Sequence, residues 1–386
     1  MSAIEFHPLT FVDEHDGVVV GRPDTESYAV LPHDGAALLR QLAAGREAGE
    51  AAQWYLSEYG ESVDIGGFVS TLRELGFVRE GPQSATPPPR LRLRRLSAWL
   101  FSPVAWGVHA LLVAVCVAVM VTHPDVRPRP DNVFFTPSLV AVQLALAFVQ
   151  VPAVAWHESF HVLAGRRLGL PTRLTVSRRL FFIVVEAHLD GLYSVPRKQR
   201  QLPFLAGMLA DVLLFSALTL VAAAGPRPVA AFALAVAYTV LLRLAWQFYV
   251  FLRTDLYYVF TTLLGCTDLH GATSAYLRRK LSRLPRVKPP ADDADSAWSQ
   301  RDRVMAPWFA LITVGGVGIL LTTVVLALIP LTVGFLTRLG PALAHGTADG
   351  ARFWDSATAV GLLALEFTLL ILISRREASR SGADSR

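Results

Sequence analysis

Six apolar stretches, each long enough to cross a bilayer, dominate the chain after residue 97. They cover residues 98–121, 137–156, 203–224, 229–252, 306–333 and 356–374. Each is close to the ~20 residues that a transmembrane helix needs, and none is long enough to be two. The pattern therefore predicts a polytopic α-helical membrane protein with about six transmembrane helices. In the rival interpretation one stretch, chiefly the first with its early Ser102-Pro103, is a re-entrant or surface helix.

The first 80 residues follow a different pattern, in which short apolar runs are separated by Asp, Gly and Pro. Alternating runs predict three strands at 9–12, 18–20 and 28–31. Helical periodicity then predicts helices at 36–42, 51–59 and 68–75, followed by a short strand at 77–78. This order is typical of a winged helix, so we expect a small N-terminal α+β winged-helix-like domain.

The composition agrees with a membrane protein. Of the 386 residues, 53% are hydrophobic and 17% are charged, whereas a soluble domain carries about 25% charged residues. The two cysteines, Cys116 and Cys266, lie far apart, which excludes a disulfide scaffold and a cysteine-based zinc ribbon. The first 30 residues contain several acids and no apolar core of signal-peptide length, so we expect no cleaved export signal.

The distribution of basic residues predicts the orientation. They cluster before the first apolar stretch, between the second and third, between the fourth and fifth, and after the sixth. The clusters contain Arg90, Arg92, Arg94 and Arg95; Arg166, Arg167, Arg173, Arg178, Arg179, Arg197, Lys198 and Arg200; Arg278, Arg279, Lys280, Arg283, Arg286 and Lys288; and Arg375 and Arg376. Because cytoplasmic loops carry the excess of Lys and Arg, we expect a multi-pass protein of the cell membrane with both termini cytoplasmic. The net charge of +5 is too small to suggest nucleic acid as a partner, and the lipid bilayer is the expected environment.

A metal-binding pattern ends the second apolar stretch, where residues 157–161 read HESFH. On a helix, positions four apart share a face, so His157 and His161 can reach one Zn²⁺ while Glu158 stands beside it. This is the chemistry of a zinc peptidase, in which the metal polarises the scissile carbonyl and acidifies water, and the glutamate takes the proton. The alternative is a chance match on a surface helix, but three ionisable groups at the end of an apolar span would be costly without a function.

Zinc needs a third protein ligand, and two aspartates are candidates. Asp255 closes the fourth apolar stretch, and Asp190 lies in the predicted cytoplasmic segment HLDGLY. In the predicted topology His157 and Asp255 both lie at cytoplasmic ends of spans and share a layer, which favours Asp255. The competing interpretation of Asp255 is a helix-end carboxylate paired with Arg253.

Three further charged residues fall inside the apolar stretches. Asp211, Arg243 and Glu366 lie about 12, 15 and 14 Å from the cytoplasmic ends of their helices, counted from the helical rise. Because they share a level, Arg243 is expected to pair with Asp211, Glu366 or both and so to tie the last stretches to the rest. The less favoured alternative is that Asp211 approaches the metal.

Sequence strings around these candidates carry a family resemblance. FLRTDLYYV at 251–259 looks like an Arg-Thr-Asp-Gly-Tyr-Tyr motif, and LAGMLAD at 205–211 looks like an Ala-Gly-containing start of a span. Together with HExxH ending one span and an aspartate ending a later one, they resemble the peptide zinc metalloprotease branch of the site-2 proteases, which are intramembrane zinc metallopeptidases. Leu256 stands where that family has glycine.

The same resemblance implies two further roles. Gln247, eight residues before Asp255, matches by position but not by type an asparagine that helps to hold substrate or oxyanion in site-2 proteases. Residues 172–190, TRLTVSRRLFFIVVEAHLD, predict a β-hairpin. In the family a similar hairpin presents extended substrate beside the metal by strand addition. The alternative is an amphipathic connector on the inner leaflet.

The N-terminal strings also carry a resemblance. VVVGRPDTESYAVLPHDGAALLRQL at 18–42 and VDIGGFVSTLRELGFV at 63–78 are similar to the PqqD-like domains that recognise leader peptides in the biosynthesis of ribosomally made, modified peptides. Such a domain is expected to bind peptide along an exposed strand edge, here 28–31 or its neighbour, and against the third helix. A DNA-binding winged helix is the alternative, but the third helix offers only Arg73 as a basic residue.

The expected organisation is a PqqD-like domain (1–80), a Pro/Arg-rich linker (81–97), an intramembrane zinc metalloprotease core (98–270), a cytoplasmic loop (271–305) and a C-terminal transmembrane pair with a basic tail (306–386). The expected function is zinc-dependent cleavage of a modified-peptide precursor near the cytoplasmic face. Peptide-modifying enzymes or a transporter are possible partners. The alternatives are regulated intramembrane proteolysis of a signalling protein and a non-catalytic membrane protein of peptide export or immunity.

Overall fold

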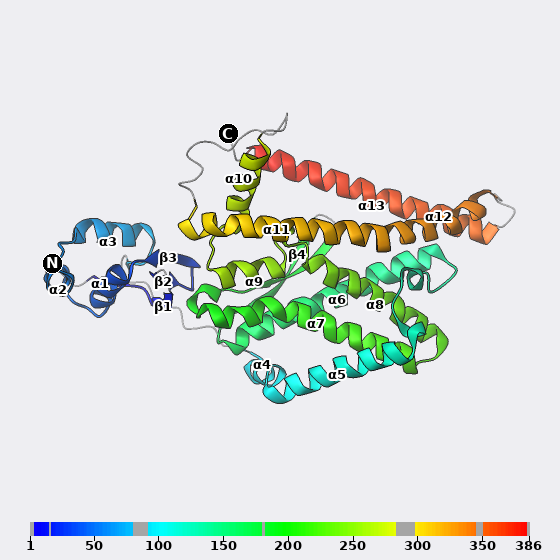
Figure 1. Ribbon diagram of the computed structural model, residues 1–386, viewed down its shortest axis with the longest axis horizontal. Coiled ribbons are helices and arrows are strands. Elements are labelled where there is room, and N and C mark those ends of the chain that lie inside the picture. Colours follow the sequence, from blue (N-terminus) through cyan, green and yellow to red (C-terminus); the bar gives the residue numbers. More distant parts are fainter. Residues whose placement is uncertain are drawn as a thin grey trace.

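The computed structural model describes residues 4–14, 17–79, 92–179, 182–282, 298–344 and 350–383. Figure 1 shows a small N-terminal unit at one end of a longer bundle of helices. We call residues 4–79 the head. Most of the predicted linker 81–97 and the middle of the predicted loop 271–305 lie outside the described residues.

The head contains the strands and helices expected from its sequence. The strands are β1 (Thr10–Glu14), β2 (Gly17–Arg22) and β3 (Ser27–Leu31), and the helices are α1 (His33–Ala43), α2 (Ala48–Tyr59) and α3 (Ile65–Glu74). The strands form one antiparallel sheet in the order β1-β2-β3, which leaves β3 at an edge. Val18 and Val20 of β2 are buried with Leu39 of α1 and Leu72 of α3 in the core of the head. In place of the predicted last strand, Val78 forms a single antiparallel bridge.

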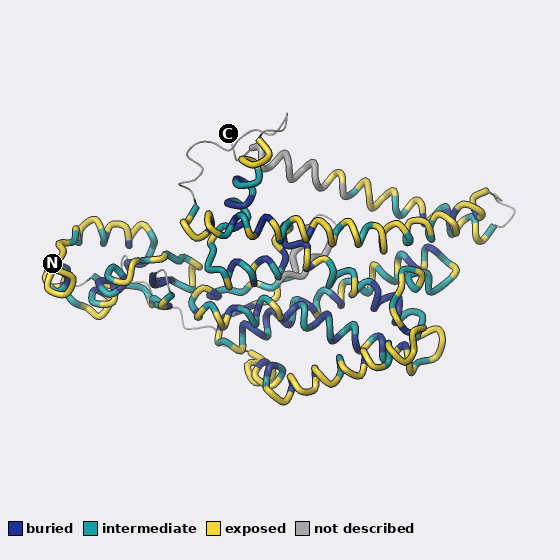
Figure 2. The backbone as a smooth tube through the Cα atoms, viewed as in Figure 1, coloured by how far each residue is buried: buried dark blue, intermediate teal, exposed yellow. Residues whose placement is uncertain are grey.

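Five helices among the described residues are long and apolar enough to cross a membrane. They are α5 (Pro103–Thr122), α6 (Leu139–Arg167), α7 (Arg197–Ala224), α8 (Arg227–Gln247) and a continuous helix over Gln300–Ala344. The continuous helix consists of α11 (Gln300–Thr323), the π-helical segment η6 (Val324–Leu328) and α12 (Ile329–Ala344). Figure 2 shows long exposed runs along α5 and along α11 and α12. Apolar side chains on these runs, such as Leu111 and Leu311, are the kind that lipid rather than water covers.

The sixth predicted stretch falls within α13 (Gly350–Ala383), which is not one of these five helices. Helix α13 returns along α12 and also reaches α6 (Figure 1). Asp355 on α13 accepts a hydrogen bond from the Leu139 backbone N–H at 2.7 Å, so this helix supplies a carboxylate to the N-terminus of α6. The last helix is thereby attached to the helix that carries the two histidines.

Two apolar stretches are interrupted where the sequence predicted continuous helices. The first divides into α4 (Arg94–Leu100) and α5, because Ser102 caps α5 by accepting a hydrogen bond from the Ala105 N–H at 3.2 Å. The fourth ends at Gln247, and the chain passes through η4 (Val250–Leu252) and a left-handed Arg253 with φ 56° before α9 (Asp255–Leu264) begins. Asp255 therefore begins a helix and does not close one, contrary to the prediction.

The predicted β-hairpin is present and follows α6. Strands β4 (Arg173–Arg179) and β5 (Phe182–His188) are antiparallel, with Leu174 opposite Ala187. Strand β5 lies beside α6, and a short 3₁₀ turn, η3 (Leu192–Ser194), connects it to α7. Two further 3₁₀ turns, η1 (Pro124–Val126) and η2 (Pro130–Val133), join α5 to α6. Residues 269–281, mostly assigned to a loop, form helix α10 (Leu269–Leu281).

Candidate metal centre

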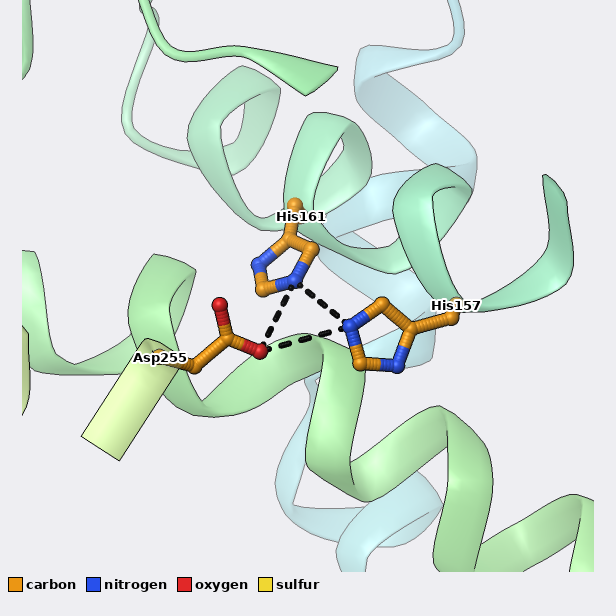
Figure 3. Close-up of side chains that lie close together, drawn as sticks. All are labelled: His157, His161 and Asp255. Atoms are coloured by element: carbon orange, nitrogen blue, oxygen red, sulfur yellow. Dashed lines mark hydrogen bonds and ion pairs between the residues drawn. The ribbon is translucent and has the colours of Figure 1, made fainter. Parts of the chain in front are cut away.

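His157 and His161 project from one face of α6 toward Asp255 in the first turn of α9 (Figure 3). Their Nε2 atoms lie 3.2 Å apart. The Asp255 Oδ2 atom lies 3.3 Å from Nε2 of His157 and 3.4 Å from Nε2 of His161. Both histidines are buried, whereas Asp255 is partly exposed. The three side chains form a group that could hold a metal ion.

These separations fit a tetrahedral ion. Bonds of about 2.0–2.1 Å at tetrahedral angles place the ligand atoms of zinc about 3.3–3.4 Å apart. Asp255 Oδ2 is buried and has no hydrogen-bond partner among the described residues. A buried carboxylate oxygen beside two imidazole nitrogens is costly unless a cation or a proton lies among them. The two nitrogens and one oxygen are therefore placed as three ligands of a metal ion could be.

Gly207 provides room beside the histidines. A Cβ atom at this position of α7 would lie 2.3 Å from Nε2 of His161 and 2.4 Å from Nε2 of His157, which is closer than real Cβ atoms approach. Only glycine lets α7 pass so near both imidazoles. The string LAGMLAD predicts the start of a helix here, but it does not predict that the glycine faces the two histidines.

The outer nitrogen of each imidazole is held by α7. His161 Nδ1 lies 2.7 Å from the carbonyl oxygen of Pro203, and His157 Nδ1 lies 3.0 Å from Oδ2 of Asp211. A carbonyl oxygen can only accept, so His161 Nδ1 carries a proton, and in the neutral ring the Nε2 lone pair then faces Asp255. A carboxylate acting on His157 in the same way orients the ring and raises the basicity of Nε2.

Asp211 is fully buried and also contacts Arg243 on α8. Nε of Arg243 lies 2.9 Å from Oδ2 of Asp211, and Nη2 lies 2.5 Å from Oδ1. Arg243 Nη1 donates to Gln150 Oε1 at 3.3 Å. Glu366, the other expected partner, is exposed on α13 and has no described contact with Arg243. The contacts of Asp211 with Arg243 and His157 therefore connect α7, α8 and α6. Helix α13 is attached to α6 through Asp355 and not through Glu366.

Gln247 holds the segment that presents Asp255. Its Oε1 accepts a hydrogen bond from the Asp255 N–H at 3.1 Å, and its backbone carbonyl accepts one from Thr254 Oγ1 at 2.7 Å. These bonds span the break between α8 and α9 and satisfy an N–H at the start of α9. Gln247 also lines a cavity of about 470 Å³ together with His157 and Glu158. It therefore positions the third candidate ligand, and its predicted contact with substrate stays a prediction.

Glu158 lies between this cavity and a second one of about 410 Å³, which His161 and Asp255 also line. Its Oε2 accepts a hydrogen bond from the Ala187 N–H of β5 at 3.0 Å. This amide points away from β4 and toward α6. The edge of the hairpin therefore faces the candidate metal centre.

Comparison with protein-family models, with curated proteins and with solved structures finds no match.

Asp190, the other candidate ligand, does not join His157 and His161. Its Oδ2 forms an ion pair with Nε of Arg173 at 3.3 Å, and the residue lines the 410 Å³ cavity. The helix break after α8 brings Asp255 to the histidines instead. Arg253, proposed as a partner of Asp255, lies 3.7 Å from Asp268.

Proposed function

We propose that this protein is an intramembrane zinc endopeptidase. The single observation that carries the proposal is the convergence of His157, His161 and Asp255 at tetrahedral spacing beside Glu158. A zinc ion held by these three side chains would polarise a scissile carbonyl and lower the pKa of water. Glu158 supplies a carboxylate next to the ligands, in the lining of both cavities, and takes the proton from water.

The hairpin provides a place for an unfolded substrate segment. A helical peptide hides its scissile carbonyls, so the substrate must be extended when it reaches Glu158. The Ala187 N–H faces the centre from the edge of β5 that no strand pairs among the described residues, and an extended peptide that adds there would accept this hydrogen bond in place of Glu158. Backbone pairing at this edge would place a peptide bond of the substrate beside the ligands.

The head favours a peptide precursor as the substrate. Its sequence resembles leader-binding PqqD-like domains, and its edge strand β3 is available among the described residues. Peptide-modifying enzymes or a transporter would then act on the same precursor. In the proposed orientation both termini, the head and the metal centre face the cytoplasm, as the basic loops predict.

Zinc content and peptide cleavage should be measured on the detergent-purified protein and on its Glu158→Gln variant. Candidate substrates are precursor peptides encoded by neighbouring genes. The variant keeps an oxygen that can accept from the Ala187 N–H, so it changes the proton acceptor and little else. Equal zinc in both proteins, with cleavage only by the unmutated one, is the expected result. Absence of zinc from metal-replete protein, or equal cleavage by the variant, would overturn the proposal.

A further inference from the structure

Part of the wall of the cavity in front of the candidate metal centre belongs to the head. The cavity of about 410 Å³ is lined by Glu26 and Tyr28 of the head, and from the rest of the chain by residues that include Glu158, His161 and Asp255. Tyr28 is the second residue of β3, and Glu26 directly precedes this strand. Access to the centre through this cavity therefore depends on where the head lies.

The head meets the helices without a shared apolar core. Among the described residues, the apolar clusters of the head contain only residues 4–78, and the clusters of the rest of the chain begin at Leu100. The ends of β1 and β2 lie against the turn η3, where the ring centres of Tyr28 and Tyr193 are 5.6 Å apart. An interface of this kind permits a rigid-body displacement, because separation breaks neither apolar core. The head can therefore move as a unit.

One buried carboxylate of the head holds this interface together. Glu14, the last residue of β1, lies 2.9 Å from Nη2 of Arg200 on α7, and both side chains are almost fully buried. A second ion pair joins Glu14 to Arg197. Arg200 also donates to the backbone carbonyls of Val195 and Tyr193, at 2.8 and 3.0 Å, which fixes its guanidinium group beside η3. Because a buried charge without its partner is costly, Glu14 keeps the head in position.

A second carboxylate of the head acts in the opposite direction. The Glu26 carboxyl group contacts the Asp190 carboxyl group and the backbone N–H of Gly191. Burial, followed by the Asp190 carboxyl group, raises the pKa of Glu26, and the nearby His188 lowers it. Two carboxyl groups in contact repel each other when both are ionised. Glu26 therefore weakens the interface that Glu14 strengthens.

We propose that the head is a lid on this cavity and that the ion pair between Glu14 and Arg200 is its latch. Release of the latch displaces Glu26 and Tyr28, so that the cavity in front of the centre opens. The inference goes beyond the proposed function, because it concerns control of access to the centre and applies to any ligand that enters through this cavity.

Hydrogen exchange of the full-length protein in detergent tests the latch without requiring zinc. Glu14→Gln keeps the size of the side chain and removes its charge. We expect backbone amides on both sides of the interface, at residues 22–28 and 189–195, to exchange about tenfold faster, with exchange in α1 and α2 unchanged. Asp13→Asn is the matched control, because the neighbouring Asp13 is exposed and pairs with Arg40 inside the head at 3.1 Å. It should leave both regions unchanged.

Loss of zinc to excess EDTA from the zinc-loaded protein reports on access to the centre. Glu14→Gln should lose zinc about tenfold faster than the unmutated protein, and Asp13→Asn at the same rate. Glu26→Gln should lose zinc about threefold more slowly, because its amide group can donate to the Asp190 carboxylate and the repulsion is gone. A general loss of stability would accelerate zinc loss in both variants, so effects of opposite sign identify the lid.

Faster exchange throughout the head of Glu14→Gln would show that this residue maintains the fold of the head, and would overturn the inference. An unchanged rate of zinc loss from Glu14→Gln, or faster loss from Glu26→Gln, would also overturn it. Absence of zinc from the metal-replete unmutated protein would instead contradict the proposed function, and hydrogen exchange would then decide on the lid by itself.

Discussion

Replacing Asp211 with asparagine should weaken zinc binding without removing a ligand. The Asp211 carboxylate is fully buried and lies 3.0 Å from Nδ1 of His157, where it orients the ring and increases the electron density on Nε2. Loss of such a contact typically costs 10–100-fold in metal affinity, or about 1.4–2.7 kcal/mol. Asparagine has nearly the same shape, so the change isolates the charge.

The same substitution should also destabilise the fold, because Arg243 loses the partner of its two shortest hydrogen bonds. Removing one member of a buried pair costs about 3–5 kcal/mol, and the value here should fall near the lower end because the Arg243 side chain is 16% exposed. A second variant, Asp211→Asn combined with Arg243→Gln, removes the unpaired charge. It should recover stability and keep the weakened zinc affinity.

Zinc affinity is measured by competition with a chromophoric chelator in detergent, and stability by thermal unfolding of metal-free protein. Glu366→Gln is the control, because this glutamate is exposed and has no described contact with the network. It should change neither quantity. Wild-type zinc affinity in Asp211→Asn would refute the argument that the carboxylate acts through His157.

Three other substitutions test separate parts of the centre. Gly207→Ala should weaken zinc binding about 10–100-fold, because the added methyl group pushes both imidazoles from their positions. Gly315→Ala is the control, since a Cβ there meets open space, and equal affinities of the two variants in a chelator titration would exclude the close approach of α7. Asp255→Asn should abolish retention of zinc through dialysis, measured by elemental analysis, whereas Asp190→Asn should preserve it. The reverse result would assign the third ligand to Asp190, which follows β5. Ala187→Pro removes the N–H that faces Glu158 without breaking the pairing of β5 with β4. It should raise KM for extended peptides about tenfold with zinc content unchanged, and an unaltered KM would argue against strand addition at β5.

The sequence was informative wherever a local period or a short spacing determines the geometry. HExxH places His157 and His161 on one helical face because four residues are close to one helical turn. The alternation in residues 172–190 and in the head likewise predicted the hairpin and the three-stranded sheet. In these segments the order of residues in the chain determines which side chains are neighbours.

Counting residues along a helix predicts how deep in the membrane a side chain lies, but not which side of the helix it occupies. Asp211, Arg243 and Glu366 were predicted at one level, and two of them meet, but Glu366 lies on the outer side of α13. Each residue turns the helix by about 100°, so a shared level does not establish contact. The position of the neighbouring helices, which determines contact, is not encoded in the hydropathy.

Helix breaks inside apolar stretches were also missed. Residues 248–252 are as apolar as the helix before them, so hydropathy continued the fourth stretch to residue 252. The structure ends α8 at Gln247 and starts α9 at Asp255. The break depends on the left-handed Arg253 and on the hydrogen bonds of Gln247, which involve residues of otherwise ordinary helical preference. The feature that brings the third ligand into place was thus the least visible in the sequence.

The continuous helix Gln300–Ala344 has a mechanical consequence. Its 45 residues span about 68 Å, more than twice the ~30 Å hydrocarbon thickness of a bilayer. A helix whose apolar stretch is longer than the bilayer core adapts by tilting, by kinking or by thickening the bilayer locally. Near its first turns Phe309 contacts Tyr257 of α9, with ring centres 5.8 Å apart. A change in tilt would therefore be transmitted through this contact to α9, the helix that begins with Asp255. Zinc affinity in reconstituted bilayers should then vary with the length of the lipid acyl chains.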